Sequence, residues 1–130
     1  MKEGIIKLVV DTNTLFMSFY NPRGKAARII EFAIEGRLEL FSPESVKDEL
    51  FEVIKREFGF PEFHINFLID SLPIKWVGKE IYKEAINKTE VKHKADKPVE
   101  ALALILNCEI LSADEHFKSR IDINKLLFDF

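Results

Sequence analysis

The feature that most constrains this chain is the apolar run over residues 5–10, which is interrupted only by Lys7 and followed directly by Asp11. A short run that is rich in β-branched residues and apolar at successive positions predicts a strand buried on both faces. Such strands lie inside parallel sheets that helices cover on both sides. The start of the chain therefore predicts an α/β fold with a carboxylate at the end of its first strand.

Helical and strand patterns alternate along the rest of the chain. Gly36 marks the end of one helix, and the next is expected to begin with Ser42 as its N-cap and Pro43 at its first helical position. We expect helices over residues 24–37, 42–58, 62–72, 79–87, 98–106 and 114–119, strands over residues 38–41, 74–77, 109–112 and 126–128, and a charged loop over residues 87–97. This alternation predicts a mainly parallel sheet with helices on both faces.

Length and composition predict a single domain over residues 1–130. The chain is 47% hydrophobic, which is enough for one core, and it contains no repeat or linker. Its single cysteine, Cys108, excludes an internal disulfide and fits a reducing compartment. No signal-peptide layout or membrane-spanning run is present, so we expect a cytoplasmic protein without a membrane partner. The net charge of −3 argues against a nucleic-acid coating protein but is compatible with a carboxylate-based nuclease.

Two acidic residues follow predicted strands directly. Asp11 ends the first strand, and Asp114 follows the strand over residues 109–112. In an open parallel sheet, ligands bind beyond the carboxyl ends of the strands, where the strand order reverses. Each residue could instead cap the next helix, but their shared edge favours a functional site.

Two further acids are candidates whose placement the pattern leaves open. Glu49 borders the apolar stripe of the helix over residues 42–58 more closely than Asp48 and Glu52 do, although periodicity alone favours a solvated helix face for such a residue. Asp96 precedes Pro98 at the start of a helix, where it could be an N-cap as well as a ligand. Carboxylates gathered in one pocket repel one another, and a divalent cation relieves that repulsion. Clusters of Cys and His for zinc are absent, because the three histidines are scattered along the sequence.

Several segments resemble the motifs of PIN-domain nucleases. The opening motif corresponds to Leu8-Val9-Val10-Asp11-Thr12-Asn13, the third to Asp96 followed by Pro98, Ala101, Leu102 and Ala103, and the fourth to Ile110-Leu111-Ser112-Ala113-Asp114-Glu115-His116-Phe117. The middle of the chain, with Asn21-Pro22-Arg23-Gly24, Gly36-Arg37-Leu38 and Ser42 leading to Glu49-Leu50, is similar to a prokaryotic subgroup of toxins from toxin-antitoxin pairs. The resemblance covers nearly the whole chain.

This resemblance implies a three-layer α/β/α sandwich with about five strands and a metal-dependent endoribonuclease. The implied catalytic and metal-binding residues are Asp11, Glu49, Asp96 and Asp114. Asp11 and Asp96 are expected to bind Mg2+ or Mn2+ directly, while the other two bind a second ion or hold metal-bound waters. Asn13, Ser112 and Thr12 are expected to hydrogen-bond these carboxylates.

Basic residues near these motifs are candidates for contact with an RNA substrate. Arg23 and Lys25 precede the first long helix, and Lys94 lies in the charged stretch before Asp96, for which the pattern favours a solvated loop over a contact with RNA. The resemblance further implies a homodimer and an antitoxin partner that inserts a segment into the acidic groove.

Other function classes fit less well. A haloacid dehalogenase-type phosphatase would need a second Asp where Asn13 stands, and a response-regulator receiver would need an adjacent acidic pair and a late lysine. The remaining alternatives are a stand-alone RNA-processing nuclease and a catalytically weak PIN fold that serves as a binding or scaffold module.

Overall fold

A computed structural model shows a sheet of five strands and describes residues 4–113, 117 and 120–128. The strands are β1 (Ile6–Val10), β2 (Leu38–Pro43), β3 (Ile74–Val77), β4 (Glu109–Leu111) and β5 (Arg120–Ile121). Their order is β3-β2-β1-β4-β5, and every pairing among the described residues is parallel. The predicted α/β sandwich with a mainly parallel sheet is confirmed.

Strand β1 lies at the centre of this sheet. Val9 is paired with Phe41 of β2, and Val10 is paired with Leu111 of β4. Leu8, Val9 and Val10 are at most 1% exposed because neighbouring strands cover both edges of β1 and helices cover both faces. The continuous apolar run in the sequence is thus explained by burial on every side.

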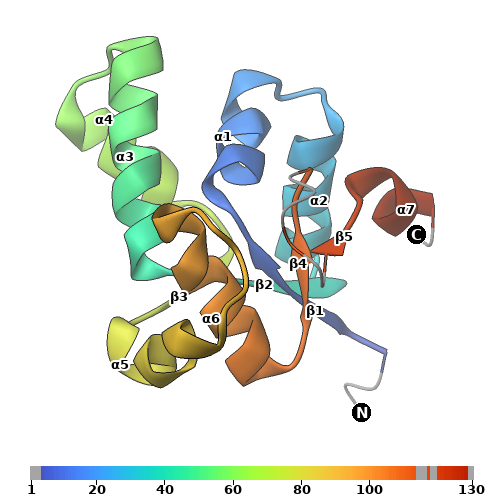
Figure 1. Cartoon of the computed structure of the whole chain (residues 1–130). Helices are drawn as coiled ribbons and strands as arrows, with labels where there is room; N and C mark the ends of the chain where they lie inside the picture. The colour runs from blue at the N-terminus through green and yellow to red at the C-terminus, as the bar shows by residue number, and fades with distance from the viewer. Residues whose placement is uncertain (1–3, 114–116, 118–119, 129–130) are drawn as a thin grey trace.

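Helices cover the sheet on both faces (Figure 1). They are α1 (Thr12–Tyr20), α2 (Lys25–Ile34), α3 (Glu44–Phe58), α4 (Glu62–Asp70), α5 (Lys79–Tyr82), α6 (Lys97–Leu106) and α7 (Ile123–Phe128), with 3-10 turns η1 (Lys83–Lys88) and η2 (Lys94–Asp96). Helix α6 packs against β1, β2 and β4, whereas α2 packs against β2, α1 and α7. Helices α3 and α4 form a pair in which α3 contacts α1 and the sheet. Within the described ranges, no helix is both long and apolar enough to cross a bilayer.

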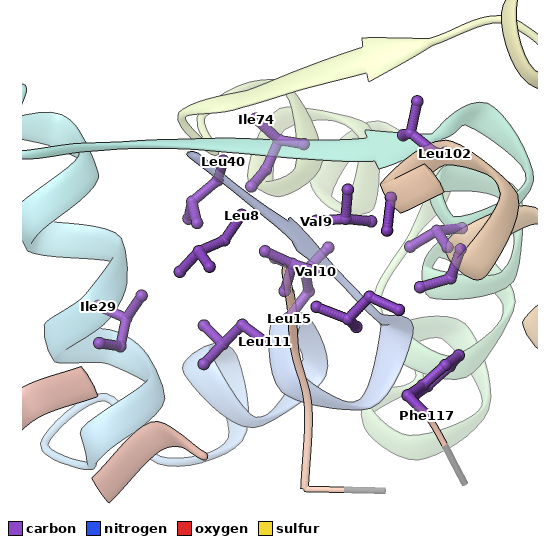
Figure 2. Close-up of a cluster of buried hydrophobic side chains, with 14 of the residues drawn as sticks. Leu8, Val9, Val10, Leu15, Ile29, Leu40, Ile74, Leu102, Leu111 and Phe117 are labelled. Carbon is purple, nitrogen blue, oxygen red and sulfur yellow. The ribbon is translucent and has the colours of Figure 1, made fainter. Parts of the chain in front are cut away.

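The core is built around β1 from side chains of both helical layers. Figure 2 shows Leu15 of α1, Ile29 of α2 and Leu102 of α6 in one cluster with the buried β1 side chains, with Ile29 on the side of Leu8. All of these side chains are at most 1% exposed. Burial of such apolar surface is the dominant favourable term in folding, and it fixes the helices that carry the polar edge of the sheet.

The predicted boundary between the strand over residues 38–41 and the helix that follows it is wrong. Ser42 and Pro43 belong to β2, and helix α3 begins at Glu44. The Ser42 side chain is fully buried, and its hydroxyl donates to the Val10 carbonyl oxygen of the neighbouring strand. Ser42 therefore supports the sheet and does not cap a helix.

The C-terminal strand predicted over residues 126–128 is also wrong, because this segment lies in helix α7. When an apolar run is short, its periodicity does not distinguish a strand from a buried helical turn. The fifth strand is instead β5, which pairs with β4.

Helix α1 was not expected, and the charged loop over residues 87–97 contains parts of η1 and η2. The helix predicted over residues 114–119 lies largely outside the described residues.

Helix α6 offers a matched test of the core. Replacing the fully buried Leu102 with Ala should lower the free energy of unfolding by about 3 kcal/mol, because the substitution removes apolar contacts and leaves a cavity. Leu104→Ala, at a position that is 48% exposed on the same helix, should cost less than about 1 kcal/mol. Urea unfolding followed by circular dichroism measures both values, and equal losses would contradict this packing.

Candidate active site

A cavity of about 480 Å³ opens beyond the carboxyl ends of β1 and β4, and we call it the acidic cavity. Its lining residues are Asp11, Thr12, Asn13, Ser45, Val46, Glu49, Ala95, Asp96, Pro98, Val99 and Ala113. The next strands of the chain, β2 and β3, lie on one side of β1 in the sheet. The later strands β4 and β5 lie on its other side. The cavity therefore lies at the point where the strand order reverses, which is where open α/β sheets bind ligands.

Three carboxylates from separate parts of the chain line this cavity. Asp11 follows β1, Glu49 lies on α3, and Asp96 immediately precedes α6. The fourth predicted acid, Asp114, lies outside the described residues. None of the described residues that line the cavity is Lys or Arg, so its charged lining residues are carboxylates.

The carboxylate of Asp11 is held through both of its oxygens. The Thr14 amide donates to Oδ1 at 3.1 Å, and the Ser112 hydroxyl donates to Oδ2 at 2.5 Å. The first bond makes Asp11 the N-cap of α1, and the second ties it to the end of β4. Asp11 is thus both a cap and a cavity residue, and its orientation is fixed before any ligand binds.

Glu49 is the acid of α3 that faces the acidic cavity. It is flanked on the helix by the buried Val46 and Leu50 and lies at the border of the apolar stripe. Glu49 and its two rivals, Asp48 and Glu52, are all exposed, but the two rivals are not among the described residues that line the cavity. The helical position inferred from the sequence therefore agrees with the structure.

Asp96 occupies the N-cap position of α6 but does not act as a side-chain cap. Its backbone is in the right-handed helical region, and its carboxylate makes no capping hydrogen bond to the first turn of α6, all of which is described. The pattern had left a capping role open. The carboxylate instead faces the acidic cavity.

The other predicted site residues separate into three places. Thr12 and Asn13 line the acidic cavity, but no hydrogen bond joins Asn13 to Asp11, Glu49 or Asp96 among the described residues. Arg23 and Lys25 line a second, adjacent cavity. Lys94 is exposed in η2 and borders neither of these two cavities.

Sequence reasoning missed several residues around the site. The Thr14 backbone amide donates to the side chain of Asp11, a bond that an Asp at the N-cap position of a helix could have suggested. Ser45 lines the acidic cavity and hydrogen-bonds Tyr82, a buried residue of α5. Burial raises the pKa of Tyr82, and the Ser45 hydrogen bond partly opposes that rise. Arg120 of β5 donates to the Ser112 carbonyl oxygen at 3.4 Å.

The donor set of the acidic cavity fits a hard divalent cation. Its charged groups are all carboxylates, and Mg2+ and Mn2+ prefer oxygen ligands and retain several waters. Over residues 4–113, 117 and 120–128, no three acidic, histidine or cysteine side chains are close enough to form a complete metal site. Waters and the substrate phosphate commonly complete the coordination of such ions.

The hydrogen bond from Ser112 to Asp11 gives a direct test of this arrangement. Ser112→Ala should lower the free energy of unfolding by about 2 kcal/mol, because a hydrogen bond to a charged group is lost in a buried setting. Ser112→Thr keeps the hydroxyl and should restore most of this stability. Ser71→Ala removes an exposed hydroxyl bonded to the Phe67 carbonyl and should change the stability by less than about 1 kcal/mol. Guanidinium unfolding measures all three variants, and a loss in Ser71→Ala as large as that in Ser112→Ala would contradict the assignment.

Comparison with known proteins agrees with this fold. The solved structures that resemble the chain include VapBC2 from Rickettsia felis bound to a DNA fragment from their promoter, with 13% sequence identity and a TM-score of 0.61 over 87% of this chain and 92% of that chain. At this identity the similarity shows the fold. No curated protein sequence matches the chain. A family model described as the PIN domain matches residues 9–124, and the chain therefore belongs to the PIN-domain family.

Proposed function

We propose that this protein is a metal-dependent endoribonuclease that hydrolyses phosphodiester bonds at the acidic cavity. The observation that carries the proposal is the convergence of Asp11, Glu49 and Asp96 on one cavity at the switch point of the sheet. PIN domains act generally as nucleases, and a cavity whose charged lining residues are carboxylates favours a divalent cation as the counter-charge.

The proposed roles follow from how each side chain is held. Asp11 and Asp96 bind Mg2+ or Mn2+ directly, and Glu49 and Asp114 bind a second ion or hold waters of the first. A cation bound there lowers the pKa of a water and neutralises charge on the phosphate oxygens. Ser112 and the Thr14 amide keep Asp11 oriented, so no reorganisation of this side chain is needed when substrate binds. Thr12 and Asn13, on the wall of the cavity, are the further candidates for hydrogen bonds to the carboxylates.

The proposed substrate is RNA, and basic residues outside the acidic cavity provide its backbone contacts. Arg23 and Lys25 lie in the adjacent cavity, close to the N-terminus of α2, and Lys94 is exposed in the turn that leads to Asp96. Cations at these positions attract the phosphate backbone toward the carboxylates.

We further propose that the protein acts as the toxin of a toxin-antitoxin pair and forms a homodimer. The sequence motifs resemble that subgroup, and the chain shares its fold with a chain of VapBC2 from Rickettsia felis. An antitoxin gene adjacent to this one would support the pair, whereas its absence would favour a stand-alone RNA-processing nuclease. Light scattering coupled to size exclusion measures the oligomeric state.

Metal binding is tested by substituting two acidic residues of α3, one inside and one outside the acidic cavity. Mn2+ should raise the melting temperature of the wild-type protein, because a ligand that binds only the folded state stabilises it by about 2.7 kcal/mol at 100 times its Kd. Glu49→Gln should need about 10-fold more Mn2+ for the same shift. Glu52→Gln removes the same charge one turn away, outside the acidic cavity, and should behave as the wild type. No shift with Mn2+, or equal shifts in the two variants, would contradict the metal site.

Catalysis is tested with a labelled single-stranded RNA in Mn2+ and in EDTA. Asp11→Asn should reduce kcat/KM at least about 100-fold while the protein stays folded, because Asn remains a good N-cap for α1. Glu52→Gln is the charge control. Cleavage that persists in EDTA or is undiminished in Asp11→Asn would overturn the enzyme proposal. RNA binding without any cleavage by the wild type would instead support the binding or scaffold alternative.

A further inference from the structure

A second cavity of about 840 Å³ adjoins the acidic cavity, and we call it the basic cavity. The two cavities share Asn13 and Ala113 in their walls. The basic cavity lies between α1, the start of α2, the end of β4 and helix α7, which packs beside α2 (Figure 1). Its size is in the range of cavities that hold small organic ligands.

The charges of the two cavities are opposite. Arg23, Lys25 and Arg28 line the basic cavity and are exposed, and none of its described lining residues is Asp or Glu. The acidic cavity shows the reverse composition. The Lys25 ammonium donates to the Asn124 side chain, so α2 and α7 are connected on this side of the molecule. A polyanion that crosses both cavities would meet cations in one and carboxylates with their counter-ions in the other.

The basic cavity also has an apolar wall. A surface that contacted only the phosphates of an RNA strand would not need one. Met17, Phe32, Ile123 and Leu127 contribute to it, and Met17 is 37% exposed. The guanidinium carbon of Arg28 lies 5.7 Å from the centre of the Phe32 ring, so the cation is placed over an apolar surface. Apolar faces beside arginines are the usual surroundings of an unpaired base and its phosphate.

We propose that the basic cavity is a nucleotide subsite that takes one unpaired nucleotide of the RNA strand adjacent to the bond held over the acidic cavity. The base lies against Met17 and Leu127, and the phosphate is bound by Arg23 and Arg28. This proposal rests on the proposed ribonuclease function and deepens it, because it makes an unpaired nucleotide beside the cleaved bond a requirement of the substrate. A base held in a duplex is stacked and paired, so it cannot enter such a cavity.

The test is a series of labelled RNA oligonucleotides in which one base is removed and the abasic position is moved along the strand. With the wild-type protein and Mn2+, kcat/KM for the cleaved bond should fall about 10-fold when the base next to that bond is missing, and less than about 2-fold when a distant base is missing. The same series is measured for binding to Asp11→Asn by fluorescence anisotropy. The binding measurement tests the subsite even if no RNA is cleaved, so the failure of the subsite and the failure of the ribonuclease proposal remain distinguishable.

Variants of the cavity wall complete the test. Leu127→Trp fills the basic cavity and should weaken binding of the intact oligonucleotide about 10-fold without a further loss for the abasic one. Ile105→Trp, at an exposed position on α6 outside both cavities, is its control. Arg28→Ala should weaken binding and reduce its salt dependence, whereas Arg56→Ala, which removes an exposed arginine beside Glu57 on α3, should do neither.

Two results would overturn the subsite. One is an equal effect of the abasic position everywhere along the strand. The other is unchanged RNA binding in both Leu127→Trp and Arg28→Ala; if these variants weaken only the binding of a protein partner, the basic cavity belongs to a protein segment and not to RNA.

Discussion

The parallel pairing of β1 between β2 and β4 is the constraint on which the rest of the molecule depends. Parallel strands end at the same edge of the sheet, so the residues after β1 and β4 meet there although they are far apart in the sequence. Asp11 and Ser112 are the direct product of this geometry. The helices that return the chain then bring Glu49 and Asp96 to the same edge.

Carboxylates that line one cavity repel one another, and this repulsion opposes the stability that the core provides. Part of the cost is offset by hydrogen bonds: Asp11 receives one from the Thr14 amide and one from the Ser112 hydroxyl. The Ser42 hydroxyl supports the strand just before Asp11 through the Val10 carbonyl oxygen. The polar groups around the site thus stabilise the backbone and orient the carboxylate at once.

The central elements of the fold could be predicted because their signals are local. The apolar run before Asp11 indicates a buried strand without knowledge of its partners. The apolar stripe of the helix favoured Glu49 over Asp48 and Glu52, but it left open whether Glu49 lies on a solvated face. The predictions failed where a contact between residues far apart in the sequence determines the local structure. Ser42 looks like an N-cap in the sequence, but a strand 32 residues away supplies the acceptor for its hydroxyl.

Other misses have equally physical causes. Helix α1 has no charged residue to mark a polar face, and its apolar residues do not follow one clear spacing, so its pattern was weak. The basic cavity could not be foreseen, because α2 and α7 come together only through tertiary packing. The four-acid proposal stays incomplete at Asp114, which lies outside the described residues.

The span of 101 residues between Asp11 and Ser112 also governs when the site can exist during synthesis. Contacts between residues so far apart carry a large loop-closure entropy and form late in folding. Until β4 has left the ribosome, the growing chain can form the β1–β2 pair and α1. It then lacks the Ser112 hydroxyl that orients Asp11 and the strand that pairs with the second edge of β1. The acidic cavity therefore takes shape only after β4 and Ser112 have left the ribosome, which delays any activity at that cavity until this strand has been made.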